Sequence, residues 1–197
     1  MNEQVKRYLV CSAFIDFDHP LVAKKATEFS DGCQTDAAIA KRCFEFVRDS
    51  ILHSWDYRRD PVTCRASDVL LHGTGYCYSK SHLLTALLRA NNIPAGLCYQ
   101  RLAVEKQGPP FCLHGMVAVY LKEYGWYRMD ARGNRADISC EFSPPIERLA
   151  FRPMNVHEKD FHEIWPEPLP IIVHVLTECK TIEQVYQNLP DIEVIKG

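Results

Sequence analysis

A cysteine, a histidine and an aspartate occur in an order that could support nucleophilic catalysis by a thiol. Cys77 follows the loop Gly73–Tyr76, which holds two glycines, and begins a segment with the pattern of a helix. The N-terminus of a helix presents free N–H groups and a partial positive charge, which favour a thiolate over a thiol. A nucleophile there also has its own backbone N–H available for an oxyanion. The alternative is a small buried residue that happens to start a helix.

His114 and Asp130 are the candidates for the groups that would assist such a thiolate. His114 precedes the apolar run Met116–Leu121, and Asp130 ends the aromatic segment Gly125–Asp130. An imidazole can accept the thiol proton, and a carboxylate on its second nitrogen orients the ring. Each residue also has a structural interpretation, as a hydrogen-bonded histidine and as a cap at a strand end. The three together, in this chain order, favour a catalytic site.

Strand geometry sets a condition on this site. Side chains alternate between the two faces of a sheet, so His114 and Asp130 can meet across a hairpin only if paired residues have an even index sum. A four-residue loop at Lys122–Gly125 would pair Leu121 with Trp126, whose index sum is odd. We therefore predict a loop with an odd number of residues, or a bulge near Gly125.

The elements that must position these residues follow from the spacing of apolar residues. Helices are predicted at residues 21–29 and 36–50, with Thr35 as the cap of the second, and a third helix runs from Cys77 to a stop at Asn91 and Asn92. Strands are predicted at residues 8–10, 95–102, 114–121, 126–131 and 171–176, and a loop at 54–61. Helices followed by an antiparallel sheet indicate the α+β class.

Composition limits the classes of protein and of partner. The chain has 197 residues, of which 47% are hydrophobic, and a formal net charge of −2. One domain over residues 1–197 is expected, and the late cluster of prolines indicates a last third that wraps around its core. We expect no nucleic-acid partner, because there is no basic excess, and no membrane association, because no apolar run could span a bilayer. The polar start and the nine cysteines favour a reduced cytoplasmic protein; the oligomeric state is unknown.

Two stretches around Cys77 resemble the core of the transglutaminase-like superfamily. The first, Ala66–Cys77, ends in G-T-G-Y-C, which matches the G-x-G-x-C turn of that family. The second, Leu83–Ala95, is rich in leucine and ends in R-A-N-N-I-P-A, where the family typically has R-A-x-G-I-P-A. A histidine 37 residues after Cys77 and an aspartate 16 residues further on also match. The resemblance covers about residues 8–140, which sets the core of the expected domain and leaves a C-terminal extension at about 141–197. The segment that starts at His114 reads H-G-M-V-A-V, which departs from the frequent H-A-W-x-E.

The resemblance implies a papain-like, transglutaminase-core α+β fold, in which N-terminal helices pack on an antiparallel β-sheet. It also implies a thiol-dependent enzyme with Cys77 as the nucleophile, His114 as general base and then acid, and Asp130 as the orienting group. The substrate would be a peptide or amide, and hydrolysis is favoured over transfer to an amine acceptor. Loops before the nucleophile supply oxyanion donors in relatives, which makes Trp55 and Tyr57 candidates. No cofactor and no metal ion are implied.

Two alternatives stay open at this point. Cys98, Cys112 and His114 could hold zinc, although the chain has no C-x-x-C pair. A transglutaminase-like module without catalytic activity, which only binds its partner, is the second. The other histidines have structural interpretations: His72 as a solvated loop residue, His82 on the flank of a helix, and His174 in the core of a strand.

Overall fold

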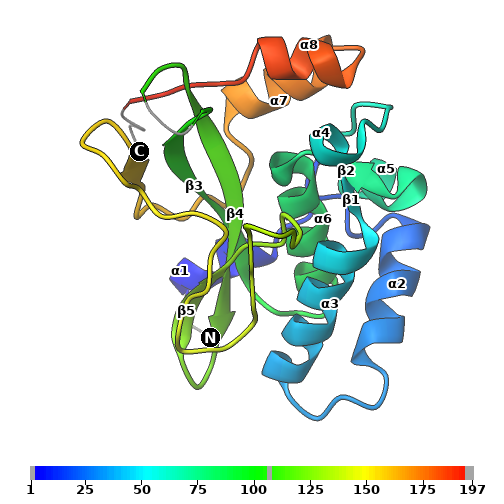
Figure 1. Cartoon of the computed structure of the whole chain (residues 1–197). Helices are drawn as coiled ribbons and strands as arrows, with labels where there is room; N and C mark the ends of the chain where they lie inside the picture. The colour runs from blue at the N-terminus through cyan, green and yellow to red at the C-terminus, as the bar shows by residue number, and fades with distance from the viewer. Residues whose placement is uncertain (1–2, 106–107, 194–197) are drawn as a thin grey trace.

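The computed structural model describes residues 3–105 and 108–193 of the chain, which form a twisted sheet with most of the helices on one side of it (Figure 1). The helical elements are α1 (Glu3–Lys6), the short 3₁₀ helix η1 (Arg7–Leu9), α2 (Pro20–Ser30), α3 (Asp36–Ser50), α4 (Ser54–Tyr57), α5 (Ala66–His72), α6 (Cys77–Ala90), α7 (Pro170–Glu178) and α8 (Ile182–Gln187). The strands are β1 (Leu52–His53), β2 (Thr74–Gly75), β3 (Ala95–Ala103), β4 (Phe111–Leu121), β5 (Gly125–Met129) and β6 (Lys159–Asp160).

Helix α6 is the centre of the molecule. Helices α2, α3 and α5 pack on one side of it and strands β3 and β4 on the other. Every residue from Cys77 to Arg89 is buried, as expected for a helix that is surrounded by protein. Its three buried basic side chains, Lys80, His82 and Arg89, have polar partners: Lys80 donates to the Ile51 carbonyl, the His82 ring pairs with the Cys64 carbonyl, and Arg89 donates to three carbonyls. Because α6 is packed on both sides, the position of its first residue, Cys77, is fixed relative to the sheet.

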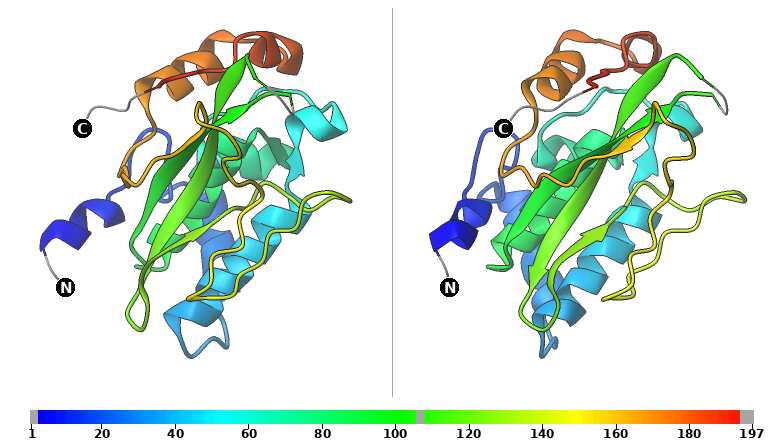
Figure 2. Two further views of the ribbon diagram at one scale, coloured as in Figure 1. Left: turned by 60° about the vertical axis from the view of Figure 1, so that its left-hand side comes forward. Right: turned by 90° about the vertical axis from the view of Figure 1, so that its left-hand side faces the viewer.

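The main sheet is antiparallel, in the order β5-β4-β3-β6. Residues of odd number, such as Leu97 and Val117, face α6 and belong to the main core. On the far face Cys98, Met116 and Ala118 form a smaller cluster, which Leu149 and Ile164 of the C-terminal segment cover. Figure 2 shows this segment returning across the strands. The fold is therefore papain-like α+β, with N-terminal helices on an antiparallel sheet.

The hairpin between β4 and β5 meets the condition set by the sequence. Leu121 pairs with Gly125, so the loop has three residues, Lys122–Tyr124, and the index sum of paired residues is even. Gly125 has a φ of 77°, which glycine adopts without strain and which is common at the end of such loops. The prediction of an odd loop is confirmed, and His114 and Asp130 lie on the same face.

Helices α2, α3 and α6 agree with the predicted ranges, and Thr35 caps α3 by accepting the Ala38 N–H at 3.1 Å. Three other predictions are wrong. Residues 7–9 form η1 instead of an edge strand, because Tyr8 is anchored by its side chain, which donates to the Ile164 carbonyl and packs on Trp126. Residues 54–57 of the predicted loop form α4. Residues 171–176 belong to α7, whose buried residues Ile172, Val175 and Leu176 follow helical spacing.

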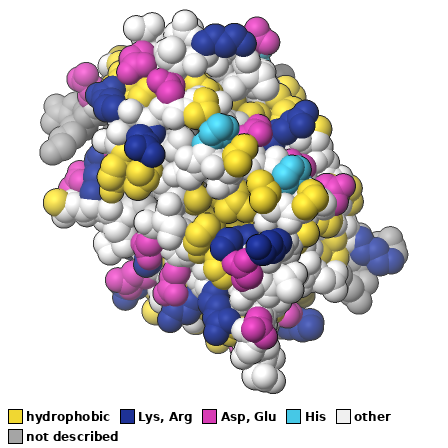
Figure 3. Space-filling view, turned by 90° about the vertical axis from the view of Figure 1, so that its right-hand side faces the viewer, with side chains coloured by type: hydrophobic (Ala, Val, Ile, Leu, Met, Phe, Trp, Pro, Cys, Tyr) yellow, Lys and Arg dark blue, Asp and Glu magenta, His cyan; other side chains and the backbone are white. Residues whose placement is uncertain are grey.

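The strands of the sheet differ from expectation only at their ends. Strand β4 begins at Phe111, so His114 is its fourth residue instead of its first, and β5 ends at Met129, directly before Asp130. The face that the helices form mixes positive, negative and hydrophobic side chains, without a large field of one sign (Figure 3). None of the helices in the described ranges is long and apolar enough to cross a membrane.

Candidate active site

Cys77 is the first residue of α6, and the loop before it is fixed by a short parallel pair of strands. Thr74 pairs with Leu52 and Gly75 with His53. A Cβ at Gly75 would lie 2.5 Å from Ser79 Oγ, so any other residue there would force the buried Ser79 side chain to move. The thiol is therefore held at a helix start, where the first backbone N–H groups have no partner within the helix. Cys77 is 8% exposed, so part of the residue reaches the surface.

His114 and Asp130 form a buried pair beside it. His114 Nε2 lies 2.7 Å from Asp130 Oδ2, and the two residues are 4% and 0% exposed. Asp130 follows β5, where continuation of the register would set it opposite Met116, so it reaches His114 on the diagonal. Cys77 lies near enough to the same imidazole for its charge to raise the pKa of His114. The structure therefore brings His114 and Asp130 into direct contact and places Cys77 near the same ring.

Hydrogen bonds stabilise the charged form of Asp130 despite its full burial. Oδ1 accepts the Arg132 backbone N–H at 3.0 Å, and Oδ2 accepts the Ala150 N–H at 3.2 Å in addition to the imidazole. Burial alone raises the pKa of Asp130, but His114 and these two N–H groups outweigh it, so the pKa lies below its ordinary value. The carboxylate is ready to orient a protonated ring.

The electrostatics of His114 follow from the same contacts. Burial lowers the pKa of His114, but the opposing effects of the Asp130 charge and of Cys77 are larger together and raise it to about 10. The imidazolium form is therefore favoured in the pair. The ring of Phe151 also lies edge-on to the imidazole, with 5.0 Å between centroids and an interplanar angle of 86°. His114 is enclosed by groups from α6, from the end of β5 and from the C-terminal segment.

Trp55 and Tyr57, the predicted oxyanion donors, both belong to α4 but have different surroundings. The Trp55 indole stacks on Tyr186 of α8 at 3.7 Å between centroids, and the Arg58 guanidinium covers its ring at 3.5 Å. Tyr57 is 57% exposed and lines a cavity of about 410 Å³. Their role as oxyanion donors stays a prediction.

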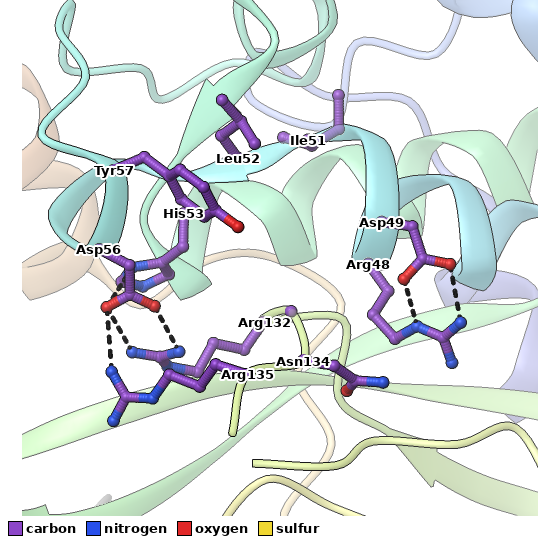
Figure 4. A pocket seen from close by; sticks show the side chains of 11 residues that line it. Arg48, Asp49, Ile51, Leu52, His53, Asp56, Tyr57, Arg132, Asn134 and Arg135 are labelled. Carbon is purple, nitrogen blue, oxygen red and sulfur yellow. Dashed lines mark hydrogen bonds and ion pairs between the residues drawn. The ribbon is translucent and has the colours of Figure 1, made fainter. Parts of the chain in front are cut away.

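Two residues near the site had no signal in the sequence. Arg132 donates its backbone N–H to Asp130, and its guanidinium forms a two-point ion pair with Asp56 at 2.7 and 2.9 Å (Figure 4). His53 is 6% exposed, lies opposite Gly75, and has a pKa well below its ordinary value, first because of burial and then because of nearby cations such as Arg132. Both line the cavity with Tyr57. The Tyr57 hydroxyl points into the space between the ion pairs of Asp56 on one side and the Arg48–Asp49 pair on the other (Figure 4). These contacts join segments about 20 to 80 residues apart and leave no local pattern to read.

The remaining histidines divide into one correct prediction and two corrections. His72 is exposed, as expected, although it is the last residue of α5 and not part of a loop. His82 is fully buried instead of lying on a helix flank, since its Nδ1 pairs with the Cys64 carbonyl at 2.7 Å. His174 is exposed on α7 instead of buried in a strand.

In the part of the chain that the structure describes, no three His, Cys, Asp or Glu side chains gather as a metal site, and Cys98 packs with Met116 and Ala118.

A thiol at the start of a central helix, facing an antiparallel sheet that carries a histidine, is the arrangement of papain-like proteins. The sequence model of the Transglutaminase-like superfamily matches residues 23–131, which is more than half of the chain. The chain belongs to the transglutaminase-like superfamily. No curated protein sequence matches it.

Solved structures show the same fold in two other proteins. A candidate cysteine protease from Cytophaga hutchinsonii superimposes with a TM-score of 0.55 at 20% identity, over 67% of this chain and 43% of that chain. The periplasmic domain of TgpA from Pseudomonas aeruginosa gives a TM-score of 0.51 at 17% identity, over 66% of this chain and 48% of that chain. This chain therefore matches less than half of the length of either solved chain. Family and fold together support a thiol enzyme in general terms.

Proposed function

We propose that this chain hydrolyses amide or peptide bonds through a thioester on Cys77, with His114 and Asp130 completing a catalytic triad. The observation that carries the proposal is the buried His114–Asp130 pair, 2.7 Å between Nε2 and Oδ2, with Cys77 at the start of α6 near enough to raise the pKa of the same ring. Burying a charged pair costs free energy, so its presence in the interior needs a reason. Because a thiol at a helix N-terminus lies beside the pair, catalysis is the reason that we favour.

The reaction would proceed in two halves. The Cys77 thiolate attacks the carbonyl carbon, and the Cys77 backbone N–H stabilises the oxyanion. His114 then donates its proton to the leaving amine nitrogen as the C–N bond breaks, which leaves a thioester. In the second half His114 takes a proton from water, the resulting hydroxide oxygen attacks the thioester, and the thiolate leaves as a carboxylic acid product forms. Asp130 holds the ring in place throughout.

Selective alkylation of Cys77 tests the nucleophile. Burial raises the pKa of the Cys43, Cys64 and Cys112 thiols to about 12, so these should react slowly at neutral pH. We expect low iodoacetamide at pH 7 to add one adduct, mapped to Cys77 by mass spectrometry, and to add none in Cys77→Ala. Cys33→Ala is the matched control, because Cys33 is a half-buried free thiol away from the pair. Slow, uniform labelling of several cysteines would instead favour the catalytically silent binding module.

The acceptor and the second oxyanion donor need separate experiments. With a peptide-like substrate and an added primary amine, a free acid product supports hydrolysis, and an amide product supports transfer. For the oxyanion, Trp55→Phe and Tyr57→Phe each remove one donor, and the true donor should lower kcat by about 10²-fold or more. The peptide or amide partner and the cytoplasmic location stay predictions.

A further inference from the structure

The segment after β5 takes part in building the candidate site, although it lies outside the family core. Residues 141–160 follow the matched range 23–131, and they run beside the strands of the sheet (Figure 2). Two of them contact the His114–Asp130 pair: Ala150 through its backbone N–H and Phe151 through its ring. A core made of residues 23–131 alone would lack both contacts.

Arg128 of β5 fixes this segment at two points. Its Nη2 lies 2.8 Å from Glu147 Oε2, and its backbone N–H donates to Glu147 Oε1 at 3.1 Å. The same guanidinium pairs with Asp160 of β6. Because Arg128 is two residues before Asp130, the path of the segment is tied to the strand end that carries the carboxylate.

Phe151 is in turn held against the imidazole from several sides. Its carbonyl accepts from Gln100 Nε2 at 3.4 Å, and Gln100 is the cross-strand partner of His114. The Arg132 guanidinium lies 5.6 Å from the centroid of its ring. The edge-on contact with His114 at 5.0 Å is therefore a fixed part of the packing.

An aromatic ring in this place restricts the imidazole in two ways. It fills the volume into which the His114 ring would turn, and it keeps water from the hydrogen bond to Asp130, which is stronger in a dry environment. The titratable and charged groups that surround His114 are Cys77 from α6, His53 from β1, and Asp130 and Arg132 from the segment after β5. Phe151 supplies the apolar wall among them.

We propose that Phe151 is a positioning residue, which holds the imidazole of His114 between Asp130 and Cys77. This inference rests on the proposed function and deepens it, because it assigns part of the site to the segment beyond the family core.

The test follows the rate of Cys77 alkylation by iodoacetamide in the full chain from pH 5 to 10. In Phe151→Ala we expect the alkylation rate at pH 7 to fall about tenfold or more. Without Phe151 the imidazole of His114 can rotate, so it is less often oriented toward the Cys77 thiol. The alkaline midpoint of the profile should also move to lower pH, because water at the pair weakens the effect of Asp130 on His114. Phe151→Tyr keeps the ring and should restore both quantities.

Phe142→Ala is the matched control, because this half-buried ring of the same segment packs on Phe44 and Tyr127 instead. In Phe142→Ala the rate of Cys77 alkylation and its alkaline midpoint should equal those of the native chain. A lower melting temperature would show that the variant has lost packing. An unchanged rate and midpoint in Phe151→Ala would overturn the inference, as would an equal change in Phe142→Ala. Unselective labelling of the native chain would overturn the proposed function itself, which keeps the two failures distinct.

Discussion

Gly115 of β4 lies directly against Tyr78 of α6, and each of them follows a member of the candidate triad. A Cβ at position 115 would lie 3.1 Å from Tyr78 Cδ1 and 3.2 Å from its Cα. Strand and helix therefore approach without a side chain between their backbones. This contact sets the separation of Cys77 and His114, which immediately precede the two residues.

Gly115→Ala tests that relationship. The added methyl must push β4 away from the first turn of α6, so we expect a loss of about 1–3 kcal/mol in the free energy of unfolding and a slower alkylation of Cys77. Gly32→Ala is the control, because its φ of 71° strains the backbone in open space after α2. Denaturant unfolding and the alkylation rate should separate the two variants. Equal alkylation rates in both would contradict the role of this contact.

Asp130→Asn removes the charge that orients His114. The buried ring then loses its strongest electrostatic partner, so the pKa of His114 should fall and the rate of the Cys77 reaction at pH 7 should drop by about 10²-fold or more. Asp137→Asn serves as control, since this exposed carboxylate pairs with Arg135 at the surface. Alkylation kinetics and an NMR titration of the histidines measure both effects. A native rate in Asp130→Asn would rule out the orienting role.

The same pair should make stability depend on pH in a defined window. The pKa of His114 is raised from 6.5 to about 10, so its contribution is complete below pH 6.5 and is lost as the pH rises toward 10. The pKa of Asp130 is lowered, so its contribution is present above its ordinary 3.8 and is lost in stronger acid. Urea unfolding should show native chain and His114→Gln differing most near pH 5 to 6. A difference that stayed constant up to pH 10 would refute this linkage.

His82 should act in the opposite direction. Burial outweighs its bond to the Cys64 carbonyl and lowers the pKa of His82 to about 4, so stability is lost as the pH falls below 6.5. His82→Leu leaves that carbonyl without its partner and should cost about 1–3 kcal/mol at pH 7. The gap between variant and native chain should shrink toward pH 5. His72→Leu, at an exposed position, should show no such trend, and a gap that widened in acid would argue against a neutral buried ring.

The parts of the fold that were predicted from sequence are those with a local cause. Helix α6 has a long apolar pattern and a stop at Asn91 and Asn92, and Asn92 adopts a positive φ of 57°. The parity of the β4–β5 hairpin followed from alternation alone. The strand predicted at residues 171–176 was wrong, because it rested on the β-branched residues of this segment. In the structure these residues lie in α7, where the burial of Ile172 and Val175 stabilises the helix.

The rest of the site depends on packing between distant segments. Arg132 meets Asp56 across 76 residues, and Ala150 reaches Asp130 from a segment without a recognisable pattern. Phe151 carries no signal at all, because a lone aromatic residue in a proline-containing segment is ordinary. Sequence reasoning therefore named the residues of the proposed triad and missed Arg132, Ala150 and Phe151, which contact its His114–Asp130 pair.

The attachment of Glu147 and Asp160 to Arg128 has a practical consequence for limited proteolysis. Met154 and Val156, at the outer part of this loop, are fully open to solvent. A cut there would separate the chain into two fragments, yet the C-terminal fragment would stay bound to β5 of the other, because Asp160 pairs with Arg128. We expect the nicked protein to elute as a single species in gel filtration, which would make the loop a convenient place for inserting a tag or probe.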